Sequence, residues 1–394
     1  MKTHFTDLFD LDVPIVDADA HVNEPPELWQ TRVPARWRDR APKVLHTDDG
    51  DFWSFEDGKR SRALGLTATA GLSFPQFRPE GLRYSEIRPG SFEPKARLGD
   101  LDADGIWAQV LYPSVTLSGA RLYADERELQ LACVRAYNEW LAEFCDGGEG
   151  RLIGQAIVPT TGVEDAIAEV HSALALGHRG VVISAFPNGT LDAQPEDAAF
   201  WGLVEELDLP VAVHIGSFVP ARPGMKWPDT HELSFLGITG SAKAGAQALP
   251  VACSLIFSGI FEQFPRLKVV LVESNIGWIP TLLEQLDDMF LRYRWFTGAT
   301  EKMRAMPSEL FHRNLWATFM IDTVGMELRY RMNTRHLLWS TDYPHTGCDW
   351  PNSRVTIERV FRGLPLDEVR DFVNANAIEL YGLTLPGFDQ PPRA

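Results

Sequence analysis

Short apolar runs recur along the chain, and most are apolar throughout rather than alternating with polar residues. Eight of these runs are bounded by turn residues and are predicted to be strands; they span residues 15–21, 107–114, 152–159, 180–186, 210–216, 267–274, 315–322 and 336–342. Continuously apolar strands are typical of a parallel sheet that is buried on both faces. The pattern therefore predicts a buried parallel sheet.

The segments between these runs carry apolar residues at helical spacing. This spacing predicts helices over residues 126–144, 163–176, 197–207, 250–264, 279–293 and 366–380. Alternating strands and helices form right-handed βαβ units, and eight such units close into a (β/α)8 TIM barrel of the α/β class. An open doubly wound sheet is the alternative, but residues 22–26 are not the glycine-rich phosphate turn that it normally carries after its first strand.

Two connections are too long for simple loops: residues 22–98 after the first strand and residues 217–249 after the fifth. Both follow the carboxyl end of a strand, so we expect both to lie over the catalytic face of the barrel as lids or substrate-binding loops. Four basic residues in them are candidates for binding a substrate carboxylate, although each is more typical of a solvated surface: Arg78, Arg83, Arg222 and Lys226. No repeat or linker divides the chain, so residues 1–394 are predicted to form a single elaborated domain.

Composition and charge exclude several classes of function. The chain has 394 residues, of which 45% are hydrophobic, and this is enough for a large core. The formal net charge of −17 disfavours nucleic acid and anionic membranes as partners, because both require a basic patch. The four cysteines form no C-x-x-C pair, which predicts neither a disulfide framework nor a thiolate metal cluster. Without a signal-like N-terminus or an apolar run of roughly 20 residues, a cytoplasmic location is expected.

Acidic and histidine residues lie at the ends of the predicted strands. Asp19 and His21 are two residues apart on the first strand, so both side chains project from the same face. His214, Glu273 and Asp342 end the fifth, sixth and eighth strands. Because the carboxyl ends of barrel strands converge and hold catalytic groups, we predict one divalent metal ion with four ligands: Asp19, His21, His214 and Asp342. Two imidazoles favour Zn²⁺, our first choice, and two carboxylates favour Mn²⁺, the alternative.

The role of Glu273 stays open at this point. An unpaired carboxylate buried at the end of an aliphatic strand would cost on the order of several kcal/mol. Glu273 could be a further metal ligand, a general acid or base kept neutral by burial, or a residue that orients His214. Asp17, Asp322 and His345 are expected to be supporting partners or caps, not ligands.

Together these motifs resemble the amidohydrolase superfamily: the Asp19-x-His21 pair, His214 on strand five, and the Ser-Thr-Asp-Tyr-Pro-His segment at residues 340–345. Within it, the chain resembles the branch of aminocarboxymuconate semialdehyde decarboxylase and of the aromatic-acid decarboxylases that act on γ-resorcylate and 5-carboxyvanillate. Further signatures of that branch lie at residues 255–265, 276–280 and 376–382, and the resemblance covers about residues 13–383.

The resemblance places Asp19 and His21 at the H-x-H or E-x-H pair of the family and implies that His214 is a metal ligand. It also implies a homodimer or homotetramer. The sequence departs from the family pattern at two positions. Asp19 stands where relatives carry His or Glu. Glu273 stands where decarboxylases usually carry a histidine that is thought to help proton transfer.

Two reactions fit these residues. We favour metal-dependent, non-oxidative decarboxylation of a small aromatic or unsaturated carboxylic acid, in which the metal binds the substrate carboxylate and Asp342 protonates the adjacent carbon. The alternative is metal-dependent hydrolysis of an amide, ester or lactone, in which Asp342 deprotonates a metal-bound water. A non-catalytic barrel would be expected to have a broken ligand set, and glycoside hydrolysis requires a carboxylate pair instead of histidines at two strand ends.

Overall fold

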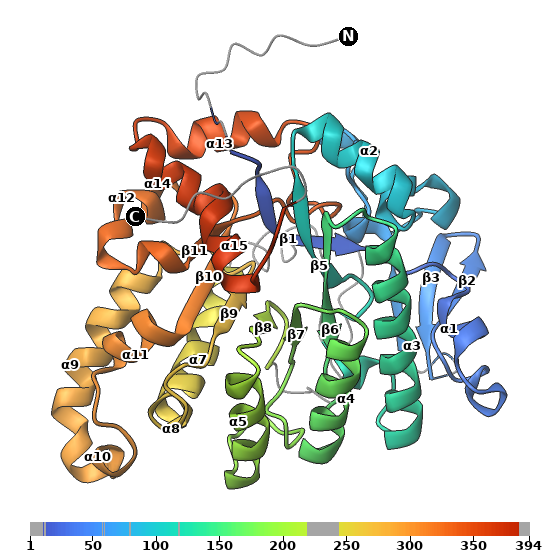
Figure 1. Cartoon of the computed structure of the whole chain (residues 1–394). Helices are drawn as coiled ribbons and strands as arrows, with labels where there is room; N and C mark the ends of the chain where they lie inside the picture. Colours follow the sequence, from blue (N-terminus) through green and yellow to red (C-terminus); the bar gives the residue numbers. More distant parts are fainter. Residues whose placement is uncertain are drawn as a thin grey trace.

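Eight parallel strands form the central sheet, in the order β1-β5-β6-β7-β8-β9-β10-β11 (Figure 1). The computed structural model describes residues 11–385 except 12, 57, 59, 79, 117–118 and 219–243. The strands are β1 (Val16–Val22), β5 (Ala108–Pro113), β6 (Leu152–Ile157), β7 (Gly180–Val182), β8 (Val211–His214), β9 (Val269–Val272), β10 (Leu315–Phe319) and β11 (Leu337–Trp339). Each strand overlaps one of the eight predicted runs, so the prediction of a parallel sheet is confirmed.

The sheet closes where the segment after β11 meets β1. The N–H of Asp342 donates a hydrogen bond to the carbonyl of Asp19 (2.8 Å), and the N–H of His21 donates one to the carbonyl of Tyr343 (2.5 Å). The strand order and this closure confirm the (β/α)8 barrel and exclude the open doubly wound sheet. The closing hydrogen bonds involve three of the predicted site residues.

Helices surround the barrel in Figure 1. They include α3 (Arg127–Asp146), α4 (Val163–Ala175), α5 (Ala198–Glu206), α7 (Ala244–Phe257), α8 (Ile260–Gln263), α9 (Ile279–Thr297), α10 (Ala299–Lys302), α11 (Pro307–Asn314), α12 (Thr323–Glu327), α13 (Ser353–Phe361), α14 (Leu366–Arg370) and α15 (Asn376–Tyr381). The predicted helix over residues 250–264 is in fact two helices, because Gly259 adopts the left-handed conformation (φ +85°) between α7 and α8. The predicted helix over residues 366–380 is likewise divided by a π-helical turn, Asp371–Ala375.

The interior of the barrel is filled by a compact set of side chains. Small and branched residues of alternate strand positions form one buried cluster, among them Val16, Ala18, Val110, Ala212 and Val270. The same cluster includes Leu380 of α15. The barrel is thus a packed core, and the polar site residues lie beyond this packing at the carboxyl ends of the strands.

The insertion after β1 is more ordered than the sequence indicated. It contains α1 (Leu28–Arg32), a three-stranded antiparallel sheet of β2 (Lys43–Thr47), β3 (Gly50–Phe55) and β4 (Arg60–Ala63), and it leads into α2 (Pro94–Asp104). One part packs beside α3, where the indole N–H of Trp29 donates to the carbonyl of Cys133 (3.1 Å). A second part meets the loop after β11, where the N–H groups of Thr69 and Ala70 donate to the carbonyl of Pro344 (2.8 and 3.1 Å).

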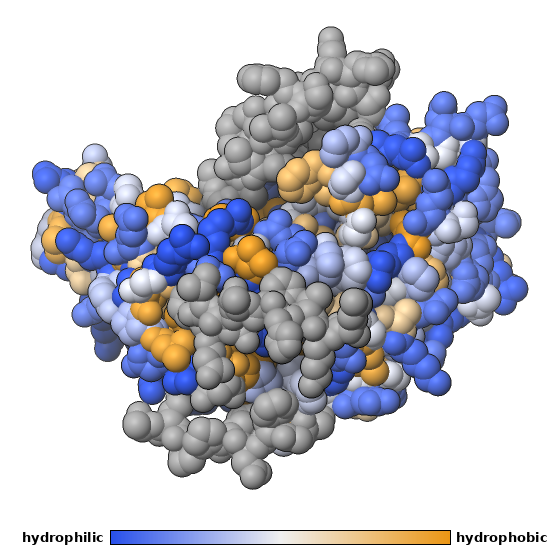
Figure 2. Space-filling model, turned by 90° about the horizontal axis from the view of Figure 1, so that it is seen from above, coloured by the Kyte–Doolittle hydropathy of each residue, from blue (hydrophilic) through white to orange (hydrophobic). Residues whose placement is uncertain are grey.

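The lid role of residues 22–98 stays a prediction: one part of the insertion packs on α3, and another part meets the loop after β11. Most of the predicted insertion at 217–249, with Arg222 and Lys226, lies outside the described residues. Among the helices that the structure describes, none has the length and apolar character needed to span a membrane. The face seen in Figure 2 is mostly hydrophilic, with small hydrophobic groups between polar ones.

Candidate metal centre

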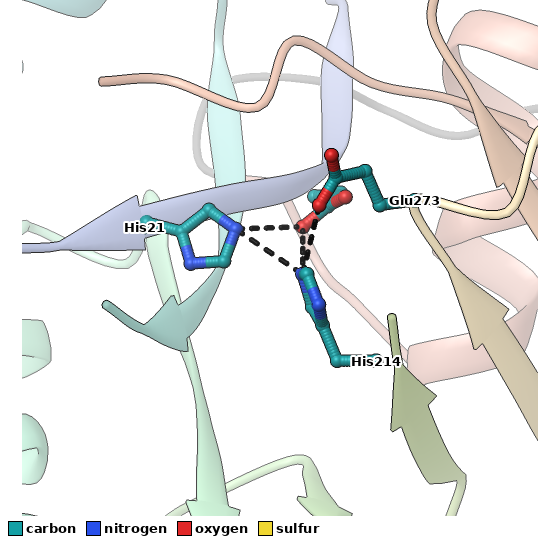
Figure 3. A group of neighbouring side chains, drawn as sticks. His21, His214 and Glu273 are labelled. Atoms are coloured by element: carbon teal, nitrogen blue, oxygen red, sulfur yellow. Dashed lines mark hydrogen bonds and ion pairs between the residues drawn. The ribbon is translucent and has the colours of Figure 1, made fainter. Parts of the chain in front are cut away.

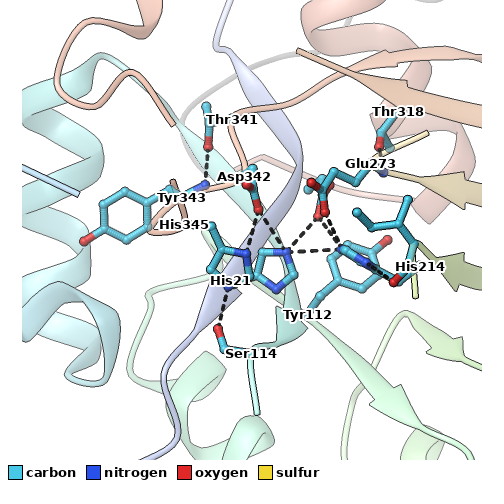
Figure 4. Close-up of polar contacts among 12 residues, drawn as sticks. His21, Tyr112, Ser114, His214, Glu273, Thr318, Thr341, Asp342, Tyr343 and His345 are labelled. Carbon is cyan, nitrogen blue, oxygen red and sulfur yellow. Dashed lines mark hydrogen bonds and ion pairs between the residues drawn. The ribbon is translucent and has the colours of Figure 1, made fainter. Parts of the chain in front are cut away.

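The structure brings all five predicted site residues together. Asp19 and His21 lie in β1, His214 is the last residue of β8, Glu273 follows β9, and Asp342 follows β11. The side chains of His21, His214 and Glu273 point toward one another in Figure 3, and Asp342 joins them in Figure 4. All except Glu273 are fully or almost fully buried. Convergence of the strand ends, which the sequence predicted, thus places two imidazoles and three carboxylates in one small volume.

The potential ligand atoms lie close together. Nε2 of His21 is 3.5 Å from Oδ1 of Asp19 and 3.3 Å from Oδ1 of Asp342. Nε2 of His214 is 3.5 Å from the same Asp19 oxygen and 3.8 Å from Oε2 of Glu273. The two imidazole Nε2 atoms are 3.2 Å apart. These separations are within the range that a single central ion spans when it binds several ligands at 2.0–2.2 Å, as is roughly typical of zinc.

Backbone carbonyl groups determine the tautomers of both imidazoles. Nδ1 of His21 is 3.0 Å from the carbonyl oxygen of Pro113, and Nδ1 of His214 is 3.2 Å from that of Ile215. A carbonyl oxygen only accepts hydrogen bonds, so each Nδ1 carries the hydrogen. Burial, and then the neighbouring His345, lowers the pKa of His21 to about 3, so this ring is neutral. Its Nε2 therefore presents a lone pair to the centre of the cluster.

The arrangement of these atoms fits a cation. Bare imidazole nitrogens and carboxylate oxygens in contact repel one another unless a positive charge lies between them. Both carboxylate oxygens of Asp19 are buried and have no hydrogen-bond partner within the described part of the chain. Oδ1 of Asp342 is also buried and faces Nε2 of His21 (3.3 Å) and Nδ1 of His345 (2.9 Å). An unsatisfied buried acceptor costs about 1–3 kcal/mol, and more when it is charged. A divalent ion would satisfy all of these atoms, so the residues present fit a metal ion.

The pKa values of the Glu273 and Asp342 side chains are both raised in the absence of a cation. Burial, followed by the nearby carboxylates of Asp342 and Asp19, raises the pKa of Glu273 well above its usual range. Burial also raises the pKa of Asp342, although the adjacent His21 opposes the rise. The Glu273 side chain is the most accessible of the group, at 23% exposed. It is therefore the carboxylate best placed to meet a substrate.

Two of the acidic residues have strained backbones. Glu273 (φ 56°) and Asp342 (φ 59°) both adopt the left-handed conformation, which a non-glycine residue adopts at a cost on the order of 1–3 kcal/mol. Neighbouring elements hold them there: the N–H of Glu273 donates to Oγ1 of Thr318 in β10 (2.7 Å), and the N–H of Asp342 donates to Asp19. Strained residues of this kind cluster at functional sites, because the unusual backbone directs a side chain to a position that a regular strand would not allow.

His345 and Ser114 belong to the site, although the sequence assigned His345 only a supporting role and did not identify Ser114. Nδ1 of His345 is 2.9 Å from Oδ1 of Asp342, and its Nε2 is 2.8 Å from Oγ of Ser114. The imidazole ring of His345 stacks on that of His21, with centroids 3.8 Å apart (Figure 4). Ser114 could have been identified from its position at the end of the predicted strand 107–114, since the other candidates also lie at the ends of strands.

The remaining candidates lie away from the cluster. Asp322 accepts a hydrogen bond from the N–H of Gly325 (2.8 Å) and caps α12, as expected. The two described arginine candidates pair with acids of the insertion: Arg78 lies 3.3 Å from the exposed Glu86, and Arg83 lies 3.5 Å from the buried Asp51. Asp17 is buried below Asp19 and makes only protein contacts.

The chain is similar to known proteins in sequence and in fold. The chain is 27% identical to a γ-resorcylate decarboxylase of Rhizobium sp. (strain MTP-10005) over 264 residues, which are 64% of this chain and 77% of that protein. An amidohydrolase structure from Mycobacterium avium subsp. paratuberculosis K-10 matches with a TM-score of 0.72 and 20% identity, over 95% of this chain and 99% of the other. A dihydroxybenzoic acid decarboxylase from Polaromonas sp. JS666, solved with manganese and 2-nitroresorcinol, matches with a TM-score of 0.59 and 16% identity, over 94% and 97%.

A family model described as Amidohydrolase matches residues 16–383, which span the whole barrel from β1 to the end of α15. The chain therefore belongs to the amidohydrolase family.

Proposed function

We propose that this protein is a metal-dependent, non-oxidative decarboxylase of a small aromatic acid that carries a hydroxyl group beside its carboxylate. The observation that carries the proposal is a pair of overlapping groups that share His21. Asp19, His21, His214 and Glu273 form one group, and His21, Asp342 and His345 form the other. Both oxygens of Asp19 are buried without a hydrogen-bond partner among the described residues. The similarity to γ-resorcylate decarboxylase supports this reaction over others of the family. The substrate is thus a small-molecule carboxylate.

We propose Asp19, His21, His214 and Asp342 as ligands of one divalent ion, with Glu273 as a fifth. The sequence favoured zinc because of the two imidazoles, with manganese as the alternative because of the two carboxylates. The position of Glu273 adds a third carboxylate, and an oxygen-rich set suits Mn²⁺ better than Zn²⁺. Manganese in the related dihydroxybenzoic acid decarboxylase supports the same choice. Metal analysis of the purified protein tests it.

In this proposal the bound ion would hold the substrate carboxylate and its neighbouring hydroxyl group in place. Asp342 acts as the general acid, since burial raises its pKa above the ordinary range of an aspartate and so favours its protonated form. Its proton passes to the ring carbon that bears the carboxylate. The bond between that carbon and the carboxylate then breaks, its electron pair restores the aromatic ring, and carbon dioxide leaves. Asp342 regains a proton from solvent, so one proton is consumed for each carbon dioxide released.

His345 would support this step by holding the acid in place. Its Nδ1 contacts Oδ1 of Asp342, while Ser114 contacts its Nε2. If Nδ1 carries the hydrogen toward the carboxylate, the hydroxyl group of Ser114 must donate to Nε2. One imidazole would then orient the proton donor, in a chain that lacks the histidine usually found at the position of Glu273.

Incubation with hydroxylated benzoic acids, including γ-resorcylate and 5-carboxyvanillate, tests the reaction by the carbon dioxide released. Benzoate without an ortho hydroxyl group is the matched control and should not react. Amides, esters and lactones are assayed in parallel. Hydrolysis of any of these without release of carbon dioxide from the acids would replace this proposal with the hydrolytic alternative.

The predicted location and assembly also stay proposals. We expect a cytoplasmic homodimer or homotetramer. Cell fractionation checks the location, and light scattering of the purified protein checks the mass of the assembly.

A further inference from the structure

A second buried carboxylate lies directly below the proposed metal ligands. Asp17 precedes Asp19 by two residues in β1 and is 0% exposed. Its Oδ1 accepts hydrogen bonds from the N–H groups of Asp19 (3.2 Å) and Thr341 (2.9 Å). Its Oδ2 accepts from the amide of Gln109 (2.9 Å) and the hydroxyl of Thr341 (2.5 Å). With two donors on each oxygen, Asp17 is occupied by protein contacts and is not itself a ligand.

The donors to Asp17 come from both sides of the barrel closure. Asp19 belongs to β1, whereas Thr341 follows β11 and immediately precedes Asp342. One carboxylate therefore fixes the backbone beside two proposed ligands that are more than 300 positions apart in the sequence. The hydrogen bond from the N–H of Asp342 to the carbonyl of Asp19 completes the same junction. The relative placement of the two ligand carboxylates depends on this junction.

A buried arginine determines the orientation of Asp17 through Gln109. Arg97 of α2 is 0% exposed, and its guanidinium donates to Oε1 of Gln109 (2.8 Å) and to the carbonyl of Gly90 (2.6 Å). Because Arg97 occupies the amide oxygen, Gln109 must present its NH2 group to Asp17. Arg97 also donates to the carbonyl of His21. The guanidinium of Arg97 and the carboxylate of Asp17 therefore bind opposite ends of the same amide group.

We propose that Asp17 is a positioning residue that sets the separation of the Asp19 and Asp342 carboxylates, with Gln109 and Arg97 fixing its orientation. Its contacts favour this role over general support of the fold, since they go to a ligand backbone and to the residue beside another ligand. The inference rests on the metal site of the proposed function and not on the decarboxylation reaction.

Three variants test the role of Asp17. Asp17→Asn replaces one acceptor oxygen with an NH2 group that faces donors. Thr341→Val removes the hydroxyl that donates to Asp17 and accepts from the N–H of Tyr343 (3.1 Å), and Thr341→Ser retains that hydroxyl. Mn²⁺ affinity is measured by titration, and the electron paramagnetic resonance spectrum of bound Mn²⁺ reports its ligand geometry. We expect Asp17→Asn to weaken Mn²⁺ binding by about 10- to 100-fold, as loss of a partner to a ligand does. Thr341→Val should weaken it by about 10-fold, Thr341→Ser should bind like the wild type, and the first two should show altered spectra.

Asp104→Asn is the matched control. Asp104 is also a buried carboxylate, and it accepts from the N–H (2.8 Å) and hydroxyl (2.6 Å) of Ser353, which is not one of the cluster residues. This variant should lose stability but keep the Mn²⁺ affinity and spectrum of the wild type. An equal loss of Mn²⁺ binding in Asp104→Asn, or a folded Asp17→Asn protein with wild-type affinity and spectrum, would overturn the proposal.

If Asp17→Asn does not fold, the Thr341 pair decides, and equal affinities in Thr341→Val and Thr341→Ser would refute the role. The proposed reaction fails separately, since a wild-type protein that binds Mn²⁺ but releases no carbon dioxide contradicts the reaction alone. A wild-type protein that binds neither Mn²⁺ nor Zn²⁺ overturns the metal site and this inference with it.

Discussion

Metal binding to this protein should release protons, and Glu273 should supply one of them. In the metal-free protein, burial and the carboxylates of Asp342 and Asp19 raise the pKa of Glu273 well above its usual range. Oε2 of Glu273 lies 3.8 Å from Nε2 of His214, within the cluster that would surround the ion. A cation binds the ionised carboxylate, so the proton must leave when the metal enters. The variant Glu273→Gln keeps the size of the side chain and removes this proton.

The magnitude follows from the number of protons displaced. At pH values below the raised pKa, each displaced proton lowers the apparent metal affinity about tenfold, or about 1.4 kcal/mol, for each unit that the pH falls. Displacement of the one proton on Glu273 should lower the metal affinity of the wild type by about tenfold for each unit that the pH falls. The metal affinity therefore rises with pH and levels off above the raised pKa of Glu273. In Glu273→Gln the slope should be lower by one proton.

Titration of Mn²⁺ at a series of pH values, with protein of each type, measures both slopes. Isothermal titration in two buffers of different ionisation enthalpy counts the released protons independently. Equal slopes in the wild type and Glu273→Gln, or a wild-type affinity that does not change with pH, would refute the reasoning about Glu273.

Three further perturbations have expected outcomes. Asp342→Asn should lower the rate of carbon dioxide release by at least about 1,000-fold, because it removes both the general acid and a metal ligand. Circular dichroism should show an intact fold. Activity that survives the substitution would show that Asp342 is not the general acid. Ser114→Ala should lower the rate of carbon dioxide release by about 10-fold without changing the substrate KM, since it removes the hydroxyl that contacts Nε2 of His345. A change in KM alone would instead indicate that Ser114 binds the substrate. Arg97→Met should lower the free energy of unfolding by about 3–5 kcal/mol in urea titrations, because it leaves three buried acceptors unpaired: Oε1 of Gln109 and the carbonyls of Gly90 and His21. A loss below about 1 kcal/mol would show that the buried guanidinium is not needed.

The sequence predicted the barrel well because its strands are buried on both faces. A run such as Val269–Val272 has few alternatives to a strand in a parallel sheet, and the ends of such strands converge once the barrel closes. The predicted cluster of acids and histidines follows from that closure alone. The antiparallel sheet of the insertion was missed because a strand such as Lys43–Thr47 is short and largely exposed, so it carries little apolar signal.

The contacts that orient the site could not be predicted, because they join residues far apart in the chain. His345 meets Ser114 across 231 positions, and Thr341 meets Asp17 across 324. Local spacing carries no information about such pairs. The left-handed backbone of Glu273 is likewise a result of tertiary packing, since nothing in an aliphatic strand that ends in glutamate predicts it.

The central claim is a metal-dependent decarboxylation, and one measurement tests it most directly. Release of carbon dioxide from γ-resorcylate or a related hydroxylated benzoate is followed with protein stripped of metal by a chelator, before and after Mn²⁺ or Zn²⁺ is added back. We expect no release from the stripped protein and recovery at about one equivalent of metal per chain. Release that is equal in the stripped and reloaded protein, or no release from any acid in the panel by protein that demonstrably holds the metal, would contradict the account.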